Sequence, residues 1–158
     1  MSTTASLPLT ISRARKIAHD KLDFKQLRPA QEAAIRSLME GRDTLAIMPT
    51  GSGKSAIYQI TGRLLDAPTV VISPLIALQH DQVESIEEAG IGEAARLNTT
   101  LTAGEREVTL DAIDDGEIDF IFLAPEQLAN EETLAHVTAA KPGLVVIDEA
   151  HCVSEWGH

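Results

Sequence analysis

The sequence contains few cysteines and few cations, and each shortage excludes a kind of protein. Cys152 is the only cysteine among 158 residues, so the chain forms no internal disulfide and no zinc site built on cysteines. Asp and Glu outnumber Lys and Arg by 24 to 13, which gives a formal net charge of −11 at pH 7. That sign excludes a protein whose whole surface holds DNA by counterion release. Any contact with nucleic acid must therefore be local.

Long apolar runs are also missing. No stretch approaches the ~20 apolar residues that a membrane helix needs, and the start of the chain lacks the apolar core of a signal peptide. We therefore expect a cytoplasmic protein that does not contact membranes. Hydrophobic residues still make up 44% of the chain, and 158 residues are enough for one domain with a sizeable core.

The most informative stretch is Met48–Ser55, a glycine-rich turn between an apolar run and a helical pattern. Such a turn points consecutive backbone N–H groups at one place, where the helix dipole adds positive charge. Gly51 and Gly53 allow a close approach that a Cβ would block. Lys54 supplies a cation for the β- and γ-phosphates, and the Ser55 hydroxyl can ligate Mg²⁺. The segment therefore predicts a phosphate-binding loop for ATP and Mg²⁺.

Short apolar runs alternate with helical patterns along the rest of the chain. Because helices cover both faces of a parallel sheet, its strands appear in a sequence as continuous apolar runs. The alternation therefore predicts an α/β, doubly wound parallel sheet. The predicted strands are Thr44–Met48, Thr69–Ser73, Ala95–Leu97, Phe120–Leu123 and Leu144–Ile147. The predicted helices are Ser12–Leu22, Pro29–Glu40, a helix from Ser55 onward, Ile76–Ala89, Thr102–Asp114 and Asn130–Ala139.

The N-terminal residues differ from this pattern. Residues 1–12 are rich in Ser and Thr and show no periodicity, so we expect a flexible tail. The rest of the chain, 13–158, is expected to form one domain.

Polar residues follow three of the predicted strands. In open α/β sheets ligands bind beyond the carboxyl ends of the strands, where the segments 49–55, Ser73–Leu75 and Asp148–Glu149 are predicted to lie. From a strand end Asp148 can face a metal, and Glu149 can point at the water that attacks the γ-phosphate. The two motifs together predict ATP hydrolysis with Lys54 and Glu149 as the catalytic residues.

These motifs resemble the first RecA-like domain of superfamily 2 helicases and, within that superfamily, the DEAH-box RecQ family of ATP-dependent DNA helicases. The resemblance covers roughly residues 22–158. Four stretches carry it, namely Leu27–Gln31, Met48–Ser55, Val71–Val83 and Asp148–His158. Two shorter segments, Asn98–Thr100 and Ala124–Leu128, also lie where the family has short motifs.

The resemblance implies a role for each matched residue. Gln31 would read the adenine edge, with Arg28 assisting and Phe24 offering an apolar face to the base. The implied ATP-binding residues are Phe24, Arg28, Gln31, Thr50, Gly51, Ser52, Gly53, Lys54 and Ser55. Ser55 and Asp148 would hold Mg²⁺, and His151 would couple the nucleotide state to DNA. The implied nucleic-acid contacts are Ser73, Pro74, Leu75, Gln79 and Trp156.

The resemblance also implies an activity. It is ATP-dependent unwinding of DNA in the 3′–5′ direction, in repair and recombination, on single-stranded or forked DNA without sequence specificity. Such an enzyme also needs a second RecA-like domain. The chain ends at His158 within the family's aromatic-rich loop, before a strand expected between the strands that carry the two catalytic motifs. We therefore expect unpaired backbone groups on both of those strands and no helicase activity from these residues alone.

Two other functions stay open. A P-loop ATPase of another superfamily 2 branch, such as an RNA helicase or a restriction subunit, would prefer RNA or carry a different segment after Asp148–His151. The segment Cys152–His158 argues against that alternative. The other possibility is a non-enzymatic truncated product that at most binds nucleotide or a partner.

Overall fold

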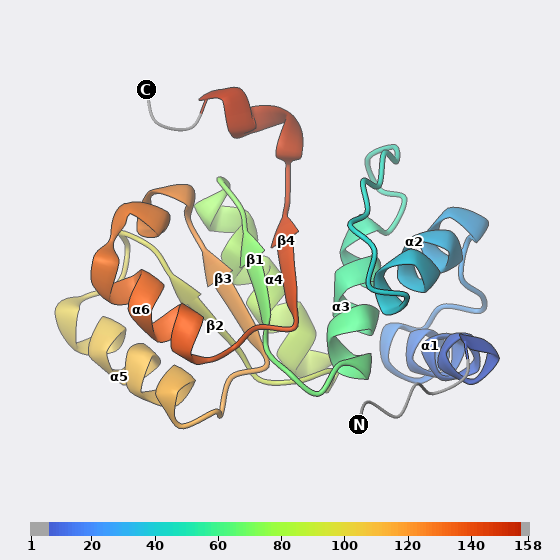
Figure 1. The fold of residues 1–158 in the computed structure, drawn as a ribbon, viewed down its shortest axis with the longest axis horizontal. Helices are drawn as coiled ribbons and strands as arrows, with labels where there is room; N and C mark the ends of the chain where they lie inside the picture. Colours follow the sequence, from blue (N-terminus) through green and yellow to red (C-terminus); the bar gives the residue numbers. More distant parts are fainter. Residues whose placement is uncertain (1–6, 156–158) are drawn as a thin grey trace. The chain divides into compact units, whose positions relative to one another are not determined.

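The computed structural model describes residues 7–155, which belong to two compact units (Figure 1). The first unit spans Met1–Leu65 and the second Asp66–His158. Within the first unit lie three helices, α1 (Leu7–Leu22), α2 (Pro29–Met39) and α3 (Lys54–Leu64). None of the helices in the described part is long and apolar enough to span a bilayer.

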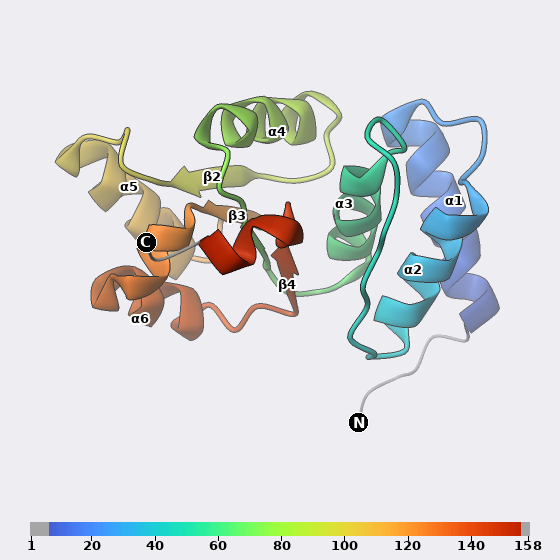
Figure 2. The ribbon, with the colours of Figure 1, turned by 90° about the horizontal axis from the view of Figure 1, so that it is seen from above.

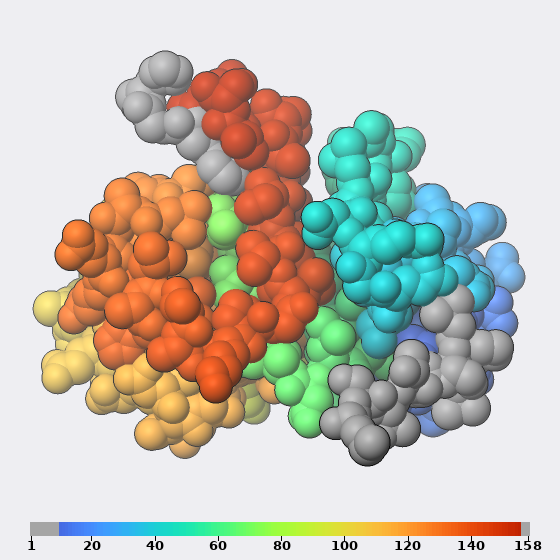
Figure 3. Space-filling view, in the orientation of Figure 1, coloured from blue at the N-terminus to red at the C-terminus, as the bar shows by residue number. Residues whose placement is uncertain are grey.

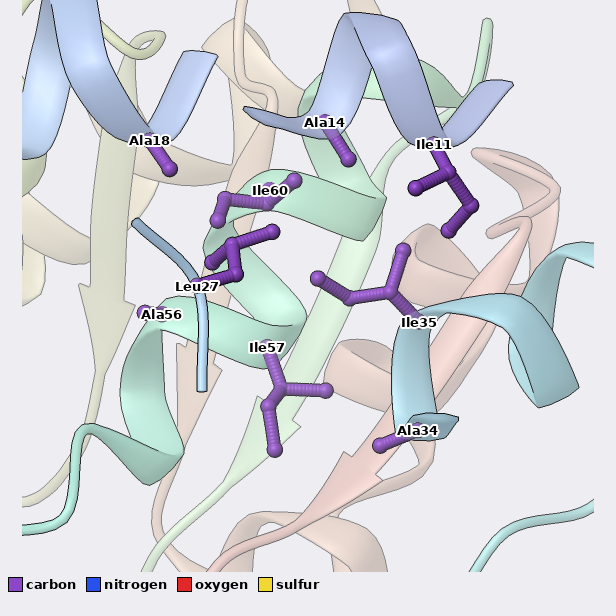
Figure 4. Packing of buried hydrophobic residues seen from close by; sticks show 9 residues of the cluster. All are labelled: Ile11, Ala14, Ala18, Leu27, Ala34, Ile35, Ala56, Ile57 and Ile60. Atoms are coloured by element: carbon purple, nitrogen blue, oxygen red, sulfur yellow. The ribbon is translucent and has the colours of Figure 1, made fainter. Parts of the chain in front are cut away.

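The core of the first unit lies between its three helices (Figure 4). Helix α1 contributes Ile11, Ala14 and Ala18, which are spaced three and four residues apart and so share one face. This face explains why the predicted N-terminal tail is too long. The helical spacing includes Ile11, which is only 4% exposed, and α1 therefore begins at Leu7 instead of Ser12. The other core residues are Leu27, Ala34, Ile35, Ala56, Ile57 and Ile60.

The second unit is built on a parallel sheet of four strands in the order β2-β3-β1-β4. The strands are β1 (Thr69–Ile72), β2 (Ala94–Leu97), β3 (Phe120–Leu123) and β4 (Leu144–Ile147). The helices between the strands are α4 (Ile76–Glu88), α5 (Ala103–Asp114), η1 (Pro125–Ala129) and α6 (Glu131–Ala139), and η2 (Ala150–Glu155) follows β4. Helix α4 covers one face of the sheet, and α5 and α6 cover the other (Figure 2). The predicted doubly wound parallel sheet is thus confirmed.

Local signals set several helix boundaries in this unit. Thr102 Oγ1 accepts a hydrogen bond from Glu105 N at 3.2 Å, and Glu105 Oε2 accepts one from Thr102 N at 2.8 Å. This reciprocal pair is the capping box predicted for α5. Its hydrogen bonds, first from the Thr102 backbone and then from its hydroxyl, lower the pKa of Glu105. Asn130 caps α6 by accepting from Thr133 N at 2.9 Å.

The predicted strand Thr44–Met48 is wrong. In the structure this segment carries no strand, and Leu45 and Ile47 are 77% and 88% exposed. An apolar run becomes a strand only when a neighbour accepts and donates its backbone hydrogen bonds, and no strand of the described sheet pairs with this segment. Strand β4 pairs with β1 alone, and its Val145 and Ile147 are about half exposed. The orange-red part of the chain that contains β4 is visible at the surface of the second unit in Figure 3.

Candidate functional site

The glycine-rich turn of the first unit forms as predicted, although the strand before it does not. Gly51 and Gly53 adopt φ values of +75° and +79°, in the left-handed region that favours glycine. The Ser52 hydroxyl donates to the Pro49 carbonyl and closes the turn. Helix α3 then begins at Lys54, so Lys54 and Ser55 lie in its first turn, where backbone N–H groups lack acceptors within the helix. The turn therefore presents the donors that a phosphate binds.

Gln31 holds this turn from the neighbouring helix. Its Nε2 donates to the Gly53 carbonyl at 3.0 Å, and its Oε1 accepts from Arg28 N at 2.8 Å. The side chain is 2% exposed. A Cβ on Gly53 would lie 2.5 Å from Gln31 Nε2 and 3.9 Å from Phe24 Cε2. The structure therefore brings Gln31 and Phe24 to the phosphate-binding loop, a contact that the sequence did not predict, and places the backbone of Arg28 against Gln31. Adenine recognition by Gln31 stays a prediction.

An ion pair joins α1 to the same helix. The Arg15 guanidinium donates to both carboxylate oxygens of Glu32, at 2.6 and 2.9 Å. These hydrogen bonds lower the pKa of Glu32 and raise that of Arg15. A carboxylate with a lowered pKa stabilises the fold above its unfolded pKa, and this contribution is lost as the pH falls through the folded value. The anchoring of α2, and with it Gln31, is therefore expected to weaken only in acid.

In the second unit the predicted carboxylates follow β4 directly. Asp148 N donates to Ile72 O at 2.9 Å, and Asp148 Oδ1 accepts from Glu149 N at 3.0 Å. Glu149 has φ +53°, a left-handed conformation that costs a non-glycine residue roughly 1–3 kcal/mol and that concentrates at functional sites. His151 Nε2 lies 3.4 Å from Glu149 Oε2. Asp148, Glu149 and His151 thus form one short chain of contacts at this strand end.

Each unit, taken separately, offers a hard oxygen donor of the kind that Mg²⁺ binds in nucleotide sites. Among residues 7–155 no group of three or more His, Cys, Asp or Glu side chains could hold a metal ion by itself. Mg²⁺ in nucleotide sites takes one or two protein oxygens, and phosphates and water supply the others. The Ser55 hydroxyl and the Asp148 carboxylate, each placed within its own unit, are hard oxygen donors of that kind.

The loop after β1 differs from the prediction. Ser73 is 2% exposed and Gln79 is fully buried, so neither side chain is available for the predicted contact with DNA. Gln79 is buried because it lies seven residues before Ile86, on the face of α4 that packs on the sheet. Pro74 is partly buried and Leu75 is half exposed. Trp156, the other predicted contact, lies outside the described residues.

Two side-chain networks at this edge of the sheet were not predicted. One joins Gln79 to Asn98, in a segment already matched to a family motif. The other is centred on Arg106 of α5, which donates to Gln127 Oε1 at 3.0 Å and Thr133 Oγ1 at 2.5 Å. Gln127 is buried in η1, within the matched segment Ala124–Leu128. The motif positions marked Asn98 and Gln127, but nothing in the sequence indicated Arg106.

The chain is similar to known helicases in sequence. Residues 28–158 match the family model for DEAD/DEAH box helicases. The chain is 37% identical over 148 residues to a probable ATP-dependent DNA helicase RecS of Bacillus subtilis. It is 40% identical over 149 residues to the ATP-dependent DNA helicase RecQ of the same organism. Both alignments cover 94% of this chain but only 29% and 25% of the relatives, so the chain spans about a quarter of their length.

Solved helicase structures share the fold. A hypothetical ATP-dependent RNA helicase from Sulfolobus tokodaii matches with a TM-score of 0.71 and 21% identity, over 94% of this chain and 43% of that one. The DUF1998 helicase MrfA, in a crystal structure bound to DNA and AMPPNP, matches with a TM-score of 0.68 and 22% identity, over 96% of this chain and 22% of that one. At these identities the likeness shows a fold, which is that of part of a RecA-like helicase domain.

Proposed function

This chain belongs to the DEAD/DEAH box helicase family, and we propose that it is the ATP- and DNA-binding part of a RecQ-like DNA helicase. The observation that carries the proposal is the phosphate-binding loop, whose two left-handed glycines precede α3 and whose Gly53 carbonyl is held by the buried Gln31. A surface turn that only reverses the chain needs no buried amide behind it. An anchored turn that leads into the first N–H groups of a helix, which have no acceptor within the helix, suits a triphosphate.

In the proposed mechanism each residue contributes position or charge. The backbone of Thr50–Ser55 and the Lys54 ammonium would hold the phosphates. Ser55 and Asp148 would hold Mg²⁺, which would neutralise negative charge on the transferred phosphoryl group. Glu149 orients the attacking water. His151 contacts the Glu149 carboxylate at 3.4 Å, so a movement of η2 would change the position of that carboxylate. We assign the coupling of DNA binding to hydrolysis to this contact.

The proposed DNA contacts lie at the loop Ser73–Leu75 and the first turn of α4. Gln79 N donates to Leu75 O at 3.1 Å, so the N–H groups of residues 76–78 have no acceptor within the helix. Backbone donors of this kind bind phosphates and do not distinguish bases. Stacking of a base on Trp156 would add about 1–3 kcal/mol. The partner is therefore single-stranded or forked DNA, bound without sequence specificity.

The activity of the whole enzyme is proposed by resemblance. It is 3′–5′ unwinding in repair and recombination, in the cytoplasm, with a second RecA-like domain. Since the chain spans about a quarter of its relatives, its own part in that activity is the binding of ATP and DNA.

Replacing Lys54 with alanine is expected to weaken Mg-ATP binding by about 30-fold, because charged hydrogen bonds contribute roughly 1.5–3 kcal/mol each. Isothermal titration calorimetry on the 158-residue chain measures the change. Lys21→Ala removes the same charge from an exposed position on α1 and serves as the matched control. Equal binding by Lys54→Ala and wild type, or equal losses in the two variants, would rule out the proposed nucleotide site.

The chain by itself is expected to leave forked DNA intact in the presence of ATP, because unwinding requires two RecA-like domains that move against each other. A strand-separation assay with a fluorescent forked substrate tests this. Separation that depends on ATP and disappears in Lys54→Ala would contradict the expectation.

A further inference from the structure

A buried series of hydrogen bonds ties together two loops at the carboxyl edge of the sheet in the second unit. Gln79 Nε2 donates to the Ser73 carbonyl at 2.9 Å, and Gln79 Oε1 accepts from Asn98 Nδ2 at 3.0 Å. Asn98 Oδ1 in turn accepts from Thr100 N at 2.9 Å and Thr100 Oγ1 at 2.6 Å. The two amide side chains thus connect the loop after β1 with the turn after β2.

Both amides are buried and both are paired at each end. Gln79 is 0% exposed and Asn98 is 4% exposed. A buried amide without partners destabilises a fold, whereas a pair of apolar side chains of the same shape stabilises it about as well as a satisfied polar pair. Stability alone therefore does not require amides here. Amides differ from apolar side chains in that their hydrogen bonds fix the positions of the particular atoms that they join.

The atom fixed by this series is the carbonyl oxygen of Ser73. On its other side Ser73 N donates to Leu123 O of β3 at 2.9 Å, so the residue is held both by the sheet and by Gln79. Pro74, with its fixed φ, and Leu75 follow at once and lead into the first turn of α4. The position of Ser73 therefore sets the position of the N–H groups of residues 76–78, which have no acceptor within the helix.

We propose that Gln79 and Asn98 are positioning residues for DNA binding, which act through the Ser73 carbonyl on the loop Ser73–Leu75 and the first turn of α4. The inference rests on the proposed function, in which this loop and turn contact the phosphates. Gln79 and Asn98 themselves do not touch DNA, since both are buried. They keep the backbone donors in the arrangement that a phosphate requires.

Two variants break the series in different ways. Asn98→Asp keeps the size of the side chain and the acceptor for Thr100, but places an acceptor opposite Gln79 Oε1. If the Gln79 amide rotates to donate to the new carboxylate, it turns its oxygen toward the Ser73 carbonyl and loses that bond. Gln79→Met keeps the length of the side chain, adds no charge and removes both bonds. Asn130→Asp is the matched control, because it adds the same charge at an exposed cap whose acceptor oxygen is retained.

The affinity for a fluorescent oligo-dT is measured by anisotropy on the 158-residue chain at one salt concentration. Hydrogen exchange of β1, β3 and residues 73–78 is measured on the same samples. We expect Asn98→Asp and Gln79→Met to weaken DNA binding by roughly tenfold. We also expect faster exchange confined to residues 73–78, and no change in either measurement for Asn130→Asp. A role in stability alone would instead speed exchange in the strands as well.

The outcomes separate the two proposals. If the wild-type chain binds Mg-ATP but no DNA, the proposed DNA-binding function fails and the inference fails with it. If the wild type binds DNA and Asn98→Asp and Gln79→Met bind it equally well, only the inference is overturned. Faster exchange throughout β1 and β3 in Gln79→Met would likewise overturn it, since the amides would then stabilise the unit and not position the loop.

Discussion

Replacing Gly53 with alanine is expected to reduce the affinity for Mg-ATP by more than about 100-fold, because two costs add to roughly 3 kcal/mol or more. The residue has φ +79°, where an L side chain is strained by roughly 1–3 kcal/mol. The new Cβ would also lie 2.5 Å from Gln31 Nε2. Gln31 is 2% exposed and hydrogen-bonded at both ends of its amide, so it moves aside only by releasing the Gly53 carbonyl. Calorimetric titration with Mg-ATP measures the loss.

Alanine substitutions at two other glycines distinguish the cost of backbone strain from the cost of the close contact with Gln31. Gly51→Ala meets the same left-handed backbone, at φ +75°, but nothing lies within 4 Å of its Cβ, so a loss of about tenfold is expected. Gly41 also has φ +75° and open space around it, but it lies at the end of α2 outside the loop. Its alanine variant is expected to bind ATP normally. Equal losses for Gly51→Ala and Gly53→Ala would refute the part assigned to Gln31.

The sequence predicted those parts of the fold that depend on local patterns. Four of the five predicted strands form a parallel sheet, and the helix starts at Pro29, Thr102 and Asn130 agree with the structure to within a residue. Caps, glycines and apolar spacing act within a few residues, so a sequence displays them directly. The segment Thr44–Met48 is as apolar as the strands, yet strand formation depends on a neighbour. Apolar content cannot supply that partner.

In the candidate site, too, the sequence predicted local features but not the contacts between side chains that lie far apart in the chain. The phosphate-binding turn was predictable because Gly51, Gly53 and Lys54 act through their own backbone and charge. The bond from Gln31 to Gly53 joins residues 22 apart and depends on how α2 packs. Gln79 was assigned to DNA by resemblance, although its spacing from Ile86 places it on the buried face of α4. Helical phase, applied to that motif, would have indicated a role beneath the surface.

Truncating Phe122 to alanine is expected to cost the second unit about 3–5 kcal/mol of unfolding free energy. The side chain is 1% exposed on β3, which lies between β2 and β1. Its neighbours Ile121 and Leu123 pack with residues of α5 and α6, so by the alternation of a strand Phe122 points to the face that α4 covers (Figure 2). The resulting cavity would lie beneath the helix that presents the proposed DNA contacts.

Since whole domains are stable by only ~5–15 kcal/mol, this loss should populate unfolded forms of the second unit. Hydrogen exchange of the β1 and β3 amides reports the opening, and DNA affinity should fall with it. Val108→Ala removes an apolar side chain of the same unit that is 69% exposed, and it should leave exchange and affinity unchanged. Phe122→Leu, which refills most of the space, should recover much of the protection. If the β1 and β3 amides exchange as slowly in Phe122→Ala as in wild type, the Phe122 side chain is not needed to hold α4 on the sheet, and the expectation is contradicted. Gln79 and Asn98 would then position the loop without support from this part of the core.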